Sequence, residues 1–310
     1  MFKKNNLHSW IETYLFYPTS PFQLILSFLL LPLTVIYCSI VLFKRFTAKP
    51  KNFNIPIISV GNLTVGGSGK TPLSIELAKD MKNVTIILRG YKRESRGMIL
   101  VSLNGTIKCD VKTSGDEAML YAKSLQNATV IVSEDRVKAI FYAKKLHSEV
   151  IFLDDGFSKA NIKKFDILIK PKTDPRFMFC LPSGAYREPR FLYAYADLVI
   201  KEDIDFKRVV KIKNPTEKMV LVTGISKPQR LNPYLPKNIV AKVHFPDHYT
   251  FEKTELEDII KKTGATSILT TTKDAVKMED FSLPLSIMEL QLEIKQEIKS
   301  RINTFLSDFR

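Results

Sequence analysis

The chain has 310 residues, of which 45% are hydrophobic and 25% are charged. That composition is typical of a globular protein and excludes a disordered chain, and the length allows two domains. A formal net charge of +15 predicts an anionic partner: a nucleic acid, a phospholipid surface or a phosphorylated substrate. Cys38, Cys109 and Cys180 are too few and too widely spaced for a disulfide framework or a metal site, which indicates a reducing compartment.

Residues 22–43 carry no charge and are long enough to span a hydrocarbon core of about 30 Å as one helix, which Pro32 would kink. We therefore expect residues 1–49 to form a membrane-associated segment. A buried core helix and a shallow, re-entrant anchor remain alternatives. Basic residues are denser after the run than before it, which favours a cytoplasmic catalytic part; the two groups are Lys44, Arg45, Lys49 and Lys51, against Lys3 and Lys4.

A phosphate-binding loop follows. The apolar run 55–60 predicts a buried strand, and Lys70 and Thr71 open a helix expected to reach Met81. The loop between them is formed by Gly66, Gly67, Ser68 and Gly69. Glycines let backbone N–H groups face an anion, the helix N-terminus and Lys70 attract it, and the Thr71 hydroxyl suits Mg²⁺. Thr64 stands where the usual pattern has glycine, so a plain glycine turn is the alternative.

Short apolar strands then alternate with helices, which predicts an α/β fold. We expect a P-loop core over 50–209, with a mostly parallel sheet covered by helices on both faces. Asn104-Gly105 predicts a hairpin turn between strands at 98–103 and 106–111. A smaller C-terminal α/β domain is expected over 210–310. Its predicted strands are 219–225, 240–245, 267–271 and 286–290, and its predicted helices are 252–263 and 293–308.

Several charged residues follow predicted strands or open helices. Asp154 and Asp155 end an apolar strand and could complete a Mg²⁺ site, or simply make a turn. Asp116 and Glu117 open a helix, where acidic residues also act as caps. His248 alone is more typical of a structural residue, although an Asp and a His together could take a proton from a hydroxyl. Arg187 and Glu188 lie in a Pro- and Gly-containing loop, where a charged pair is usually solvated, although functional loops have the same composition.

Eight segments in order resemble the tetraacyldisaccharide 4'-kinase family of lipid A biosynthesis. They are 61–72 (GNLTVGGSGKTP), 89–93 (RGYKR), 115–117 (GDE), 133–136 (SEDR), 153–157 (LDDGF), 181–189 (LPSGAYREP), 245–248 (FPDH) and 272–277 (TKDAVK). The resemblance implies an inner-membrane kinase, active on the cytoplasmic face, that moves the ATP γ-phosphoryl group to the 4'-hydroxyl of an acylated glucosamine disaccharide 1-phosphate. An anionic phospholipid surface is the second expected partner, and no nucleic acid is expected.

The same resemblance implies roles for individual residues. Lys70 and Thr71 would hold phosphate and Mg²⁺, Asp154 and Asp155 would serve the metal, and Asp116 with His248 would activate the hydroxyl. Residues implied at the nucleotide or substrate are Arg89, Tyr91, Glu117, Arg136, Arg187 and Glu188. Ser158-Lys159 depart from the family, which usually has Gln-His there, so local substrate contacts are expected to differ.

Two other functions compete with this interpretation. A membrane-tethered switch ATPase or GTPase would also need the loop, but Thr272-Lys273-Asp274 has the wrong spacing for a guanine-reading motif. A nucleic-acid binder would explain the charge, and its binding would weaken steeply with salt. Neither aromatic-basic interleaving nor zinc spacing supports it.

Overall fold

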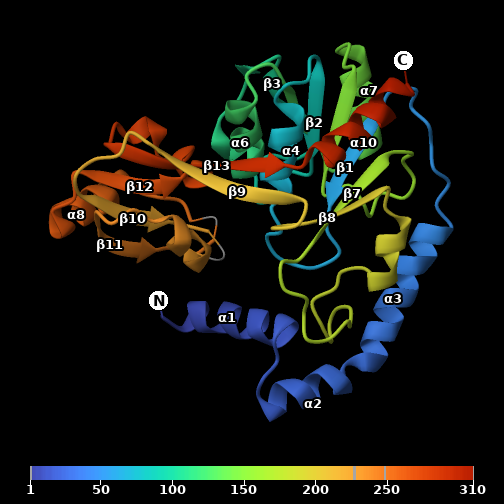
Figure 1. Ribbon diagram of the computed structural model, residues 1–310, viewed down its shortest axis with the longest axis horizontal. Helices are drawn as coiled ribbons and strands as arrows, with labels where there is room; N and C mark the ends of the chain where they lie inside the picture. The colour runs from blue at the N-terminus through green and yellow to red at the C-terminus, as the bar shows by residue number, and fades with distance from the viewer. Residues whose placement is uncertain (1, 226–227, 248, 310) are drawn as a thin grey trace. The chain divides into compact units, whose positions relative to one another are not determined.

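The computed structural model describes residues 2–225, 228–247 and 249–309, with the backbone alone for 2–6, 8 and 9 (Figure 1). The chain forms two units, each built from separate stretches of sequence. The first contains Met1–Ser74, Ala143–Lys207 and Ile294–Arg310. The second contains Ile75–Tyr142 and Arg208–Glu293. The fold thus draws on distant parts of the chain.

The larger sheet has the strand order β4-β3-β5-β2-β6-β1-β7-β8. These strands are β1 (Ile57–Gly61), β2 (Val84–Leu88), β3 (Ile99–Leu103), β4 (Thr106–Ile107), β5 (Thr129–Val132), β6 (Val150–Asp154), β7 (Phe165–Lys170) and β8 (Leu198–Lys201). Parallel pairing joins β1 to β6 and β7, β7 to β8, and β2 to β5, whereas β3 is antiparallel to β5 and β4. The predicted, mostly parallel sheet is confirmed.

Strands β1, β2 and β5 are buried at every position. Successive side chains of a strand point to opposite faces, so this burial means that both faces of the sheet are covered there. The helices that alternate with the strands are α4 (Lys70–Ala78), α6 (Asp116–Ser124) and α7 (Arg136–Lys145), with α10 (Gln296–Ser307) in the first unit.

The predicted hairpin forms at β3 and β4. Asn104 (φ 46°) and Gly105 (φ 83°) both have the left-handed backbone that a two-residue hairpin turn needs. The second strand is shorter than predicted because Asp110 accepts a hydrogen bond from the Thr113 N–H and so begins α5 (Val111–Ser114).

The smaller sheet has the order β11-β10-β12-β13-β9. Its strands are β9 (Phe206–Lys213), β10 (Met219–Thr223), β11 (Ile239–His244), β12 (Ser267–Thr271) and β13 (Leu285–Ile294). Four of them match the predicted strands, and β10 pairs parallel with both β11 and β12. The sequence interpretation missed β9, whose many lysines and arginines obscure its pattern. Helix α8 (Lys253–Thr263) ends at Gly264, which has a left-handed backbone.

The N-terminal stretch forms three helices, α1 (Phe2–Phe16), α2 (Pro21–Leu29) and α3 (Leu31–Phe46). The apolar run 22–43 forms two helices and not one continuous helix: α2 and α3 meet at a 50° bend, at the kink predicted for Pro32 (Figure 1). Pro32 lies in the first turn of α3, where its missing N–H does no harm, but it cannot continue α2. Within the described residues, only this bent pair has the length and composition that crossing a bilayer requires.

Gln23, which weakens the apolar run, has a structural role. Its side chain accepts hydrogen bonds from the Thr19 and Ser20 N–H groups, while the Ser20 hydroxyl accepts one from the Gln23 N–H. This capping box begins α2.

The turn at Gly105 gives a test of the fold. A Cβ at this residue would lie 1.6 Å from the backbone oxygen of Gln126. We expect Gly105→Ala to lower the free energy of unfolding by about 1–3 kcal/mol more than Gly97→Ala does. Gly97 has a similar φ of 76° but no atom within 4 Å of the added Cβ, so it measures the backbone cost alone. Equal thermal unfolding midpoints for the two variants would contradict this account.

Candidate functional site

The phosphate loop connects β1 to α4 in the first unit. Gly66 (φ 87°) and Gly69 (φ 89°) adopt backbone conformations that side chains rarely allow, and Lys70 is the first residue of α4. The predicted order of strand, glycine loop and helix is found, although α4 ends at Ala78 and not at Met81. The hydroxyl of Ser68 is buried and has no hydrogen-bond partner among the described residues. The loop therefore offers an anion several donors, including the N-terminus of α4.

Asn62, just after β1, connects the loop to its surroundings. Its Oδ1 accepts hydrogen bonds from Lys70 Nζ (3.0 Å) and Arg187 Nη2 (2.7 Å), and its Nδ2 donates to the Thr64 carbonyl (2.8 Å). Thr64 itself pairs with Tyr186 in an isolated β-bridge. Because Thr64 has no positive φ, this position does not require the usual glycine.

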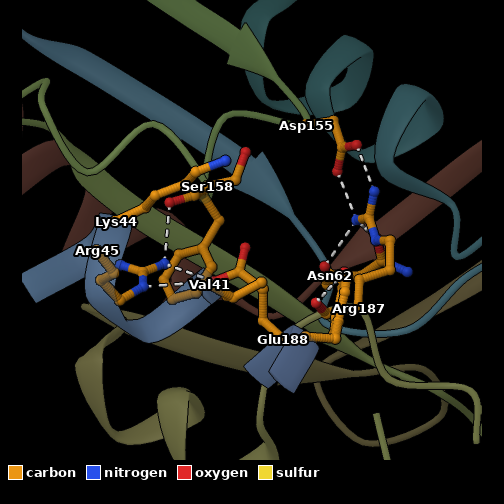
Figure 2. Close-up of a pocket in the computed structure, with 10 residues that line it drawn as sticks. Val41, Lys44, Arg45, Asn62, Asp155, Ser158, Arg187 and Glu188 are labelled. Carbon is orange, nitrogen blue, oxygen red and sulfur yellow. Dashed lines mark hydrogen bonds and ion pairs between the residues drawn. The ribbon is translucent and has the colours of Figure 1, made fainter. Parts of the chain in front are cut away.

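The acidic end of β6 faces this loop. Asp154 is the last, buried residue of β6, and Asp155 follows in a turn with φ 51°. Arg187 donates to both oxygens of Asp155, from Nη1 at 2.7 Å and from Nη2 at 2.8 Å (Figure 2). Lys70 Nζ lies 3.7 Å from the same carboxylate. The structure thus brings together three of the predicted site residues, Lys70, Asp155 and Arg187.

The neighbouring Glu188 contacts helix α3. Arg45 of α3 donates to Glu188 Oε2 from Nη2 (3.1 Å) and stacks its guanidinium on the Phe157 ring, 3.8 Å from the ring centroid. The alternative that Arg187 and Glu188 are simply solvated does not hold, because Arg187 pairs with Asp155 and Glu188 pairs with Arg45. A cavity of about 240 Å³ lies here; its lining includes Lys44, Arg45, Asn62, Asp155, Ser158, Arg187 and Glu188 (Figure 2). Ser158, one of the two departures from the family pattern, therefore lines this cavity, and Lys159 beside it is exposed.

A second group of charges lies in the second unit around Asp116. As expected of a helix start, Asp116 Oδ1 accepts a hydrogen bond from the Glu117 N–H (3.0 Å). Its Oδ2, however, faces the ammonium groups of Lys273 (3.6 Å) and Lys277 (3.5 Å), and only 6% of Asp116 is exposed. Capping alone does not explain such a cluster. His248 lies outside the described residues, so its expected pairing with Asp116 stays a prediction.

The remaining predicted residues are also in the second unit. Arg89 and Tyr91 follow β2 and are exposed, and the Lys92 ammonium lies 5.7 Å from the centre of the Tyr91 ring. Arg136 begins α7, is buried, and donates from Nη1 to the Ser133 carbonyl. Glu117 is half-buried next to Asp116.

Four contributors were not predicted as site residues. Asn62 stands in the glycine-loop segment, and Lys273 and Lys277 stand in the 272–277 segment, but neither pattern points to their contacts. Arg45 could be read only as one of the basic residues that flank an apolar run.

A glycine loop between a buried strand and a helix, a lysine opening that helix, and carboxylates at the neighbouring strand end define a P-loop nucleotide-binding protein. The family model for "Tetraacyldisaccharide-1-P 4'-kinase" matches residues 26–215 and 204–308. The chain belongs to this family.

Individual relatives agree along the whole chain. A tetraacyldisaccharide 4'-kinase of Aliarcobacter butzleri is 54% identical over 99% of this chain and all of its own length. One of Helicobacter acinonychis is 48% identical over 97% of this chain and 96% of its own. The crystal structure of LpxK from Aquifex aeolicus in complex with ATP has a TM-score of 0.77 and 30% identity, over 91% of this chain and 99% of that one.

Arg187 provides a test of the site. Arg187→Gln would leave Asp155 without its bidentate partner and draw Lys70 toward the carboxylate, away from a bound phosphate. We expect a dissociation constant for a nonhydrolysable ATP analogue that is roughly tenfold higher or more, because hydrogen bonds to charged groups contribute about 1.5–3 kcal/mol. Arg190→Gln, three residues along the chain, is the control in the same calorimetric titration. Equal affinities for the two variants would contradict the assignment.

Proposed function

We propose that this chain transfers the γ-phosphoryl group of ATP to the 4'-hydroxyl of a tetraacyldisaccharide 1-phosphate, a step of lipid A biosynthesis. The observation that carries the proposal is the phosphate loop with Lys70 between Asn62 and Asp155, in a chain that belongs to a 4'-kinase family. The relatives named above, which match nearly the whole chain, support the same acceptor.

The first unit would hold the nucleotide. Backbone N–H groups of 66–69 and the N-terminus of α4 would bind the phosphates, with Lys70 on the transferred group. Magnesium would be held by Thr71, Asp154 and Asp155, an all-oxygen set of the kind the ion prefers. When bound, this ion would neutralise charge that develops on the phosphates. Arg187 fixes Asp155 and so would orient one of these ligands.

The base would be a carboxylate. Asp116, with His248, would accept the proton of the attacking 4'-hydroxyl, since an ionised carboxylate held by neighbouring cations can act at neutral pH. The other resemblance-derived residues would contact nucleotide or lipid; they are Arg89, Tyr91, Glu117, Arg136, Arg187 and Glu188.

The acceptor's acyl chains require access to a membrane, and α2 and α3 suit one. An outer stripe of α3 formed by Leu33, Ile36, Ile40 and Phe43 is 50–69% exposed. The opposite side of α3 contacts its own unit through Thr34, whose hydroxyl donates to Ser183 Oγ (2.7 Å), and Tyr37, whose hydroxyl donates to the Arg187 carbonyl (2.7 Å). A helix held this way along its length would lie in the membrane surface and not cross it.

Exposed and half-buried aromatic residues extend the same apolar surface. The ring of Phe28 in α2 packs edge-on against Phe177 and Phe179, and that of Phe46 in α3 against Tyr195. Lysines and arginines follow the apolar stripe closely, and each well-placed cation contributes about 1 kcal/mol at an anionic lipid surface. We propose the cytoplasmic face of the bacterial inner membrane as the location.

The reaction is tested by mass spectrometry in detergent. Purified protein, ATP, Mg²⁺ and the tetraacyldisaccharide 1-phosphate should give a product heavier by one phosphate. Lys70→Ala should lower kcat by roughly a hundredfold or more, because phosphoryl transfer depends mainly on charge neutralisation. Lys79→Ala, at an exposed lysine just beyond α4, should leave the rate unchanged. ATP hydrolysis without transfer to the lipid would favour a switch ATPase instead.

Membrane binding is tested by flotation with anionic phospholipid vesicles. Ile36→Glu with Ile40→Glu places two charges on the exposed stripe of α3. We expect most of the bound protein to move to the unbound fraction, since apolar burial contributes about 25 cal/mol per Å². Val240→Glu, at an exposed valine of β11, is the matched control and should still float. Equal flotation of both variants would exclude α3 as the contact surface.

A further inference from the structure

A buried ionic cluster surrounds Asp116 in the second unit. Asp274 lies in α9 (Thr272–Ala275) and Lys277 in the turn after it. Helix α9 packs against α6. Asp274 is fully buried, and the side chain of Lys277 is 10% exposed. Charged groups are seldom buried this deeply unless each has a hydrogen-bonding or oppositely charged partner, so we expect each charge in this cluster to have such a partner.

Asp274 is the fixed end of the cluster. Its Oδ2 accepts hydrogen bonds from Thr223 Oγ1 (3.0 Å), the Gly224 N–H (2.9 Å) and Thr271 Oγ1 (3.1 Å). Its Oδ1 accepts one from Lys277 Nζ (3.2 Å). These donors come from the ends of two adjacent strands, so the Asp274 carboxylate cannot turn without breaking several bonds.

Lys277 is held on three sides. Its ammonium donates to Asp274 Oδ1 and to the Tyr249 carbonyl (3.3 Å), and it lies 3.5 Å from Asp116 Oδ2. An ammonium group has three donors, and here three acceptors from different segments face it. The charge of Lys277 is therefore fixed beside Asp116 and is not mobile on a flexible stem.

Lys273 adds a second cation at the same oxygen. Its Nζ lies 3.6 Å from Asp116 Oδ2 and 3.4 Å from Asp247 Oδ1. Burial lowers the pKa of Lys273, but the carboxylates of Asp116, Asp247 and Glu117 together raise it above its usual value. Lys273 is thus charged at neutral pH, so Asp116 Oδ2 lies near two cations.

We propose that Lys277, fixed by Asp274, and Lys273, fixed by Asp247, are positioning residues that keep the Asp116 carboxylate ionised and oriented toward the acceptor hydroxyl. This inference rests on the proposed role of Asp116 as the base. The described charged groups around Asp116 come from three segments. They are Glu117 on the same helix, Asp247 in the loop before Tyr249, and Lys273, Asp274 and Lys277 in and just after α9.

The expected pH dependence follows from the charges. A general base must be deprotonated, and nearby cations lower the pKa of a carboxyl group. Removing the charge of Lys277 takes away a cation 3.5 Å from the Asp116 carboxylate, so we expect activity to be lost at a higher pH as the solution is made more acidic. The acidic limb of the kcat/KM profile should move upward by about one pH unit or more.

The experiment measures kcat/KM for lipid phosphorylation against pH with the full chain in detergent. Lys277→Met should move the acidic limb upward, and Lys277→Arg, which keeps the charge, should return it toward the wild-type position. Lys261→Met, at an exposed lysine of α8, is the control and should not move it. In an Asp116→Asn background, Lys277→Met should have little further effect, because residues that act as a unit are not additive.

Three outcomes would overturn the inference. One is an unmoved limb in a Lys277→Met protein that keeps the wild-type thermal unfolding midpoint. Another is a raised KM for ATP or lipid with an unmoved limb, which would make Lys277 a direct ligand contact. The third is full activity of Asp116→Asn, which removes the base itself. If Lys277→Met fails to fold, Lys273→Met tests the same oxygen of Asp116 without leaving Asp274 unpaired. Absence of transfer by the wild-type protein would instead refute the proposed function.

Discussion

The bidentate pair between Arg187 and Asp155, completed by Asn62, is the contact on which the first unit depends. It joins three segments that are far apart in sequence: the end of β1, the turn after β6 and the loop around residue 187. Arg187 suits this task because its planar guanidinium can hold a carboxylate with two donors and still reach an amide oxygen. The backbone follows the same path, since the Arg187 N–H donates to the Leu63 carbonyl at 2.7 Å. The phosphate loop is thereby held in shape before any ligand arrives.

In the second unit, the main electrostatic feature is the group of charges around Asp116. Asp116 opens a helix, where backbone N–H groups already favour its negative charge, and two lysines add to that preference. Such a carboxylate faces two cations and has a fixed direction. Phosphoryl transfer relies more on the position of the reacting groups than on the strength of the base, so a carboxylate held in a fixed direction suits this chemistry. Each unit thus contributes charges whose geometry is set by partners deeper in the fold.

Much of this organisation could be predicted from the sequence. Apolar runs located β1 and every strand of the smaller sheet except β9, and the glycine loop located Lys70 because strand, loop and helix follow each other locally. What could not be predicted depends on contacts between distant segments. No local pattern connects Arg45 with Glu188, or Lys277 with Asp116, and the composition of the loop around 187–188 does not indicate which residues its charges contact. The bend within 22–43 could be predicted from Pro32, whereas its angle and the contacts of α3 could not, because they depend on packing against distant segments.

The contacts of α3 make this helix a structural part of the first unit. Thr34, Tyr37 and Arg45 contact the same loop that carries Arg187 and Glu188, and Arg45 forms an ion pair with the buried Glu188 carboxylate. A protein shortened to begin after α3 would keep every residue of the phosphate loop but leave that carboxylate without its cation, which is costly in a buried position. The N-terminal helices are therefore more than a membrane anchor that could be removed without effect on the rest of the protein. They pack against the loop that carries Arg187 and Glu188. The helices that would bind the lipid surface therefore also help to hold the nucleotide site in shape.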